Sequence, residues 1–203
     1  MKTQFLTIAT IATLLIGIAT TTKAADKDSA KNSEVSTVLT NVSYINKIEV
    51  YGNVELYVSD AAGDQVKVYN HYYTESAVVQ NRNGVLRISS YADQKLVVWV
   101  KAADLRTIAA YDNAEVKSFG TLSPIELNVE LHNDASAKLN MNTYAANVIV
   151  SDRAKADLSG NAGQLNLKHD VTSTVNQTGL TSTHSAEYKN VPADVKSQDM
   201  ATL

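Results

Sequence analysis

The sequence predicts an all-β protein whose short strands stack as a parallel β-helix, a solenoid with repeat units of about 17–23 residues. Three observations lead to this prediction. Apolar residues alternate with polar ones from Val38 onward. No stretch of a dozen residues after the N-terminal apolar run shows the 3.6-residue period of a helix. A nine-residue pattern recurs through the second half of the chain.

Composition limits the function classes. The chain has 203 residues, a formal net charge of −3 and no cysteine. This length favours one domain with a real core. The absence of cysteine excludes a disulfide scaffold, thiolate chemistry and cysteine-ligated zinc. The mild acidity does not provide the basic surface that nucleic-acid binding needs, so no nucleic-acid partner is expected.

The N-terminus resembles an export signal. Lys2 precedes an apolar run from Phe5 to Ala19, which is shorter than the roughly 20 residues of a membrane span. Small residues around Ala24 predict a signal peptide over residues 1–24, with an uncleaved anchor helix as the alternative. Because no cysteine follows, a lipoprotein anchor is not expected. The polar residues 25–37 predict a flexible linker, and the mature chain is expected in the periplasm, at the cell surface or secreted, without a membrane span.

Strand patterns begin early in the mature chain. Alternating apolar residues run from Ile48 to Val58 and again from Val66 to Tyr69. Asn83-Gly84 lies between two such runs and predicts a tight hairpin turn. The run Leu96–Val100 is apolar at every position, which predicts a strand covered on both faces.

The repeat is a nine-place pattern with an apolar residue first and small or apolar residues at places five, seven and nine. One such unit is too short to bury its own core, so stacked units are expected to share one. An antiparallel β-sandwich, which also has short strands and frequent turns, remains the alternative fold. The copies are IAAYDNAEV (Ile108–Val116), LHNDASAKL (Leu131–Leu139), VSDRAKADL (Val150–Leu158) and LKHDVTSTV (Leu167–Val175), with a looser copy IEVYGNVEL (Ile48–Leu56).

Each repeat has a polar corner. Asn and Asp tolerate the left-handed backbone that a sharp corner requires. If the copies stack in register, Asp134, Arg153 and Asp170 form one corner column of alternating charge.

Together, the export signal, the early I-x-V-x-x-x-V-x-L strand, the Asn-Gly turn before VLRIS and the corner repeats resemble the auto-transporter adhesin head GIN domain family of exported bacterial proteins. The resemblance covers Val38 to Leu180 and places the domain at residues 38–191, with a tail over residues 192–203. It implies a right-handed parallel β-helix with an adhesive or surface role, and it transfers no catalytic residue. Family members usually carry Ser-Gly-Ala at the corner, whereas this chain has Asn-Asp-Ala, Asp-Arg-Ala and His-Asp-Val.

Signals for chemistry are weak. The four histidines lack metal-ligand spacing, and no nucleophile elbow, phosphate loop or dinucleotide motif occurs. We therefore predict no catalytic, cofactor-binding or metal-binding residue. A cation shared by Asp134, Asp152 and Asp170 is one alternative. Another is a small polysaccharide lyase or hydrolase using Asp152 with Asp170, or Asp112 with Asp134, about 4.8 Å apart on neighbouring strands.

The binding hypothesis rests on tyrosine, which offers a flat apolar face and a polar tip. The candidate ligand-contact cluster is Tyr69, His71, Tyr72 and Tyr73. The predicted function is a non-catalytic envelope or secreted binding and adhesion module, whose partner is an unidentified glycan or envelope protein. The alternatives are the polysaccharide-active enzyme and a structural envelope protein that associates with itself through open end strands.

Overall fold

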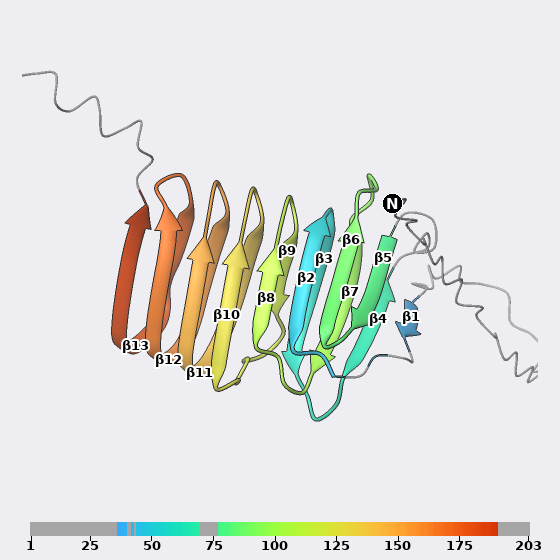
Figure 1. Cartoon of the computed structure of the whole chain (residues 1–203), viewed down its shortest axis with the longest axis horizontal. Helices are drawn as coiled ribbons and strands as arrows, with labels where there is room; N and C mark the ends of the chain where they lie inside the picture. The colour runs from blue at the N-terminus through green and yellow to red at the C-terminus, as the bar shows by residue number, and fades with distance from the viewer. Residues whose placement is uncertain (1–35, 40–41, 43, 70–76, 191–203) are drawn as a thin grey trace, which may run out of the picture. The chain divides into compact units, whose positions relative to one another are not determined.

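A computed structural model describes residues 36–39, 42, 44–69 and 77–190, and every regular element in these ranges is a strand (Figure 1). The all-β prediction is therefore confirmed. The predicted signal peptide, most of the predicted linker and the C-terminal tail lie outside the described residues. The strands are β1 (Ser36–Leu39), β2 (Lys47–Gly52), β3 (Val54–Asp60), β4 (Gln65–Tyr69), β5 (Ala77–Arg82), β6 (Val85–Ser90), β7 (Leu96–Ala102), β8 (Thr107–Ala110), β9 (Glu115–Ser118), β10 (Glu126–Leu131), β11 (Ser136–Val150), β12 (Lys155–Asp170) and β13 (Thr174–Asn190).

Two parallel ladders organise these strands. One ladder runs through β7, β3 and β9 into the first halves of β11, β12 and β13. The other runs through β6, β2, β8 and β10 into the second halves of the same three long strands. In Figure 1 the strands β8, β10, β11, β12 and β13 lie side by side in this order. The buried apolar side chains of both ladders form one hydrophobic cluster, so the core lies between the ladders.

Antiparallel strands flank the parallel ladders on the N-terminal side. β4 pairs with β7 on one side and with β1 on the other. β1 begins at Ser36, so it overlaps the last two residues of the predicted linker. β5 and β6 form the predicted hairpin, in which Arg82 pairs with Val85. Asn83 and Gly84 both have positive φ, 51° and 83°, as a type I′ turn requires. The hairpin prediction is confirmed.

Burial follows the predicted alternation. In β3 the side chains of Val54, Leu56 and Val58 are fully buried, and the intervening residues are partly exposed. The prediction that Leu96–Val100 is covered on both faces was wrong, because Val97 and Trp99 remain partly exposed. Only one face of this strand meets the core, and its other face carries the aromatic residues described below.

The predicted repeat register is confirmed for two copies and wrong for two others. Leu131 lies opposite Val150, as the aligned patterns predict. The copy at Leu167, however, is displaced by two residues, since Val150 pairs with His169. The copy at Ile108 is displaced likewise, since Leu131 pairs with Ala110. Side chains alternate between the two faces of a strand, so a slip of two residues keeps the same residues inward and leaves the apolar pattern unchanged.

The looser early copy agrees with the Ile108 copy place for place. Ile48 pairs with Ile108 at one end of the pattern, and Leu56 pairs with Val116 at the other. The nine-residue pattern therefore extends to the first parallel strands of the domain.

Candidate ligand-binding site

The candidate site lies on the outward face of β3, β4 and β7. Trp99 is opposite Tyr57 on β3 and opposite Lys67 on β4. Because Val98 and Val100 on either side of Trp99 are buried, the indole must point away from the core. Residues 57, 67 and 99 are far apart in sequence, and the strand register brings them together on one surface.

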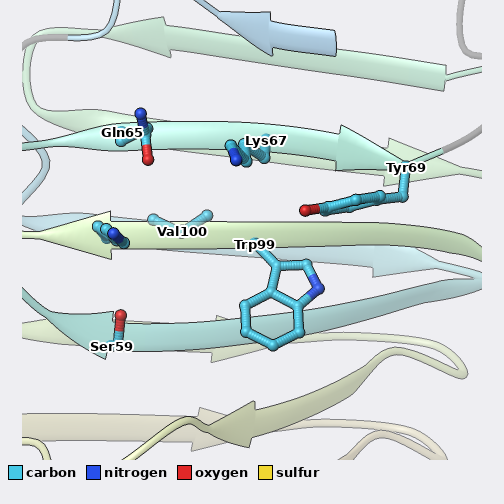
Figure 2. Close-up of a pocket in the computed structure, with 7 residues that line it drawn as sticks. Ser59, Gln65, Lys67, Tyr69, Trp99 and Val100 are labelled. Carbon is cyan, nitrogen blue, oxygen red and sulfur yellow. The ribbon is translucent and has the colours of Figure 1, made fainter. Parts of the chain in front are cut away.

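A small hollow of about 120 Å³ opens beside Trp99, with Gln65, Lys67 and Tyr69 in a row on the neighbouring strand (Figure 2). Pockets that enclose small-molecule ligands usually measure about 300–1,000 Å³. The hollow is therefore too small to enclose a whole ligand and suits contact with one side of a larger molecule. Its lining is Ser59, Gln65, Lys67, Tyr69, Trp99, Val100 and Lys101.

Three aromatic residues, Tyr57, Trp99 and Phe119, form what we call the aromatic surface. The rings of Tyr57 and Trp99 are stacked, with centroids 4.6 Å apart and an interplanar angle of 18°. Phe119 meets Trp99 edge-on at 5.2 Å. Phe119 is 62% exposed, so much of its ring remains accessible beside Trp99. The aromatic surface therefore offers apolar area to an external partner.

The acidic groups beside the aromatic surface are already paired. Lys117 contacts Glu55 at 2.7 Å and Glu115 at 2.8 Å. Its hydrogen bonds with Glu115 and Glu55 raise the pKa of Lys117 above its ordinary value. Hydrogen bonding from Lys117 lowers the pKa of Glu55, whose carboxylate also accepts a hydrogen bond from the Tyr57 hydroxyl at 2.8 Å. These carboxylates are held in an ion-pair network and do not face the hollow.

The predicted tyrosine cluster overlaps the site at one residue. Tyr69 lines the hollow, whereas His71, Tyr72 and Tyr73 lie outside the described residues. Sequence reasoning missed Trp99 and Phe119. A usable signal for Trp99 was present, because strict alternation through Leu96–Val100 places it on the face opposite the buried residues.

Of the predicted corner column, the structure brings Asp134 and Arg153 into contact and places Asp170 elsewhere. The Arg153 guanidinium contacts the Asp134 carboxylate at 2.7 Å, and this hydrogen bonding lowers the pKa of Asp134. The aligned patterns pair Val150 with Leu167, but in the structure Val150 pairs with His169. Asp170 is therefore shifted by two residues along the strand and does not lie level with Arg153.

The corner carries a ladder of side-chain to backbone hydrogen bonds. The Asp112 N–H donates to Asn133 Oδ1 at 3.2 Å, and the Asn133 N–H donates to Asp152 Oδ2 at 2.9 Å. The Asp152 N–H in turn donates to Asp170 Oδ2 at 2.8 Å. Asp112, Asn133 and Asp152 all have φ near +60°, as predicted for left-handed corners. These hydrogen bonds connect each corner to the next and stabilise the stack.

Two of the three described histidines, His132 and His169, have structural contacts. The His132 ring stacks on Tyr111 at 5.0 Å, and Tyr111 stacks on Tyr51 at 4.7 Å. His169 is buried, and its Nε2 lies 3.0 Å from Glu187. Within the described ranges, no group of three or more His, Asp or Glu side chains is arranged to hold a metal ion. In the same ranges, no helix has the length and hydropathy of a transmembrane span.

The fold is thus an all-β domain with an aromatic surface on its outward face. The chain belongs to the family described as "Putative auto-transporter adhesin, head GIN domain", whose sequence profile matches residues 45–189. The resemblance seen in the sequence is thereby confirmed. No functionally curated protein shows significant similarity to the chain.

Several crystal structures share the fold. A "putative adhesin" from Bacteroides fragilis is 14% identical, with a TM-score of 0.66 over 77% of this chain and 78% of that chain. A "putative adhesin" from Parabacteroides distasonis is 15% identical, with a TM-score of 0.61 over 77% of this chain and 78% of that chain. A "putative lipid binding protein" from the same species is 6% identical, with a TM-score of 0.60 over 78% of this chain and 79% of that chain. At these identities the likeness establishes the fold alone.

Proposed function

We propose that this protein is a non-catalytic, exported binding module of the adhesin type, which contacts a polysaccharide through the aromatic surface and the adjoining hollow. The observation that carries the proposal is the cluster of Trp99, Tyr57 and Phe119 on one outward face. Membership of the adhesin head family supports both the binding role and a location in the envelope or outside the cell.

We propose that the repeats form a right-handed parallel β-helix. Such a fold provides a rigid base for the site. Parallel pairing of β11 with β12 over 14 residue pairs supports this architecture. So does the regular spacing along the paired positions, where Leu131, Val150 and His169 follow each other at intervals of 19 residues. Stacked strands hold their outward side chains at fixed spacing, which suits recognition of a repeating polymer.

Carbohydrate is the ligand class that the surface fits best. The apolar C–H faces of a sugar ring pack against flat aromatic rings, and its hydroxyls can use polar groups at the rim. Ser59 and Gln65 supply such groups beside Trp99. The hollow can receive one sugar unit or substituent while the rest of the polymer lies across Phe119.

Trp99 makes the proposal directly testable, because it is the only tryptophan in the sequence and its fluorescence reports on the site itself. The mature protein, residues 25–203, is screened against an array of bacterial and host polysaccharides. Polymers that bind are then titrated while Trp99 emission is recorded. We expect saturable binding to one glycan class, accompanied by a change in Trp99 emission. The variant Phe119→Ala should lose at least tenfold in affinity. The Phe119 side chain is exposed, so its removal leaves no cavity in the core.

Tyr144→Ala is the matched control, since Tyr144 is a 66% exposed aromatic residue on β11 that takes no part in the aromatic surface. It should bind like the wild type. Silence across the whole array, or equal loss of binding in both variants, would contradict the proposal.

A further inference from the structure

Two lysines beside Trp99 differ from the other basic residues of this region. Lys67 and Lys101 line the hollow, and neither has an ion-pair partner among the described residues. By contrast, Lys117 and Lys95 on the same face both contact Glu115. The lining of the hollow contains no acidic residue.

The register places the two charges on different sides of the indole. Lys67 is directly opposite Trp99 on β4. Lys101 follows Trp99 by two residues, so it lies on the same face of β7. Its neighbours across the strands are Ser59 on β3 and Gln65 on β4. An anion seated at the hollow would therefore lie near two cations while the attached sugar ring contacts Trp99.

We infer that the polysaccharide bound at this site is anionic, with its acidic groups held by Lys67 and Lys101. The inference rests on the proposed function and narrows its ligand class. Charge complementarity carries it: the chain as a whole is acidic, with a net charge of −3, yet the hollow is locally basic. A polyanion that contacts the hollow would be attracted by these two lysines, with no carboxylate in the lining to oppose it.

The test uses pairs of polymers that share a backbone and of which only one carries charged substituents. Polygalacturonate is compared with its fully methyl-esterified form, and dextran sulfate with dextran, by titration of Trp99 fluorescence. We expect one or both anionic polymers to bind at least tenfold more tightly than their neutral partners. Raising the salt concentration from about 0.1 M to about 1 M should weaken this binding, because the screening length falls from about 10 Å to about 3 Å.

Substitutions locate the charges. Lys67→Gln and Lys101→Gln should each weaken binding of the anionic polymer about two- to fivefold, the effect of losing a solvent-exposed ion pair. The matched control is Lys168→Gln, since Lys168 is an exposed lysine in the second half of β12 without an ion-pair partner among the described residues. Binding by this variant should equal that of the wild type.

The outcomes separate the two proposals. If neutral polymers bind as tightly as anionic ones and Phe119→Ala still abolishes binding, the ligand is a neutral glycan: the inference is overturned and the proposed function stands. If Lys168→Gln weakens binding as much as Lys67→Gln, attraction is not localised at the hollow and the inference is also overturned. If Phe119→Ala binds every polymer like the wild type, the aromatic surface is not the site and both proposals fail.

Discussion

Trp99 and Tyr57 lie opposite each other on neighbouring parallel strands, with their rings stacked at a centroid distance of 4.6 Å. The stack stands on the outward face, above the buried side chains of Val98 and Leu56. It therefore contributes to stability without belonging to the core, and it fixes the orientation of the indole at the candidate site.

A double-mutant cycle measures this contact. Tyr57→Leu, Trp99→Leu and the double variant should give a coupling free energy of about 0.5–1.5 kcal/mol in urea unfolding, the range for aromatic pairs beyond their buried area. Unfolding is followed by far-ultraviolet circular dichroism, because the Trp99 variants lack the fluorophore. Additive effects of the two single substitutions would show that the stacking adds nothing to simple burial.

The ion pairs of Lys117 predict acid sensitivity. Hydrogen bonding with Lys117 is the main cause that lowers the pKa of both Glu55 and Glu115 below their ordinary value of 4.5. The folded protein then binds fewer protons than the unfolded chain near that pH. The resulting stabilisation is fully present above about pH 4.5 and is lost as the pH falls through the lowered folded-state pKa values.

Lys117→Met should flatten this dependence, because the two carboxyls then lose the main partner that favours their charged forms, while Glu115 keeps its contact with Lys95. The measurement is the free energy of unfolding as a function of pH for both proteins. Lys138→Met is the control, since Lys138 is 74% exposed and lies 3.7 Å from Asp157. A profile for Lys117→Met as steep as that of the wild type would contradict the assignment.

The register between β11 and β12 can be tested by cross-linking, because the sequence contains no cysteine. Ile149 pairs with Lys168, so Ile149→Cys with Lys168→Cys should form a disulfide under mild oxidation. The register predicted from the sequence patterns would instead place Ile149 opposite Asn166. In the structure that pair is two residues further apart along the strand, by about 6–7 Å. Cross-linking of Ile149→Cys with Asn166→Cys in preference to the first pair would contradict the structure.

Gly160 should be sensitive to the smallest substitution. Its φ is +100°, and a Cβ atom there would lie 2.0 Å from the backbone oxygen of Met141 on the neighbouring strand. Gly160→Ala is expected to lower the free energy of unfolding by about 3 kcal/mol or more, because backbone strain and a clash with main-chain atoms add.

Two other glycines separate these causes. Gly120 has a φ of +85° and no atom within 4 Å of a Cβ, so Gly120→Ala should cost only the left-handed strain, about 1–2 kcal/mol. Gly63 has neither feature, and Gly63→Ala should change stability little. Chemical denaturation of the three variants gives the order directly. Equal effects at Gly160 and Gly63 would refute the geometry around Met141.

The sequence alone determined the class of fold, the hairpin at Asn83-Gly84, the left-handed corners at Asn133 and Asp152, and the family. Each follows from local information. Alternation with period two identifies strands and their inward face, and Asn, Asp or Gly at a turn identifies positive φ.

Only the tertiary structure decided the register at the first and fourth repeat copies and the composition of the candidate site. A two-residue slip keeps every inward side chain inward, so the apolar pattern has the same form in either register. For this reason the sequence could not place Asp170 in the corner. The site brings Tyr57, Lys67, Trp99 and Phe119 together by pairing between strands that are distant along the chain. Such contacts depend on which strands become neighbours, and the periodicity of each strand carries no information about its neighbours.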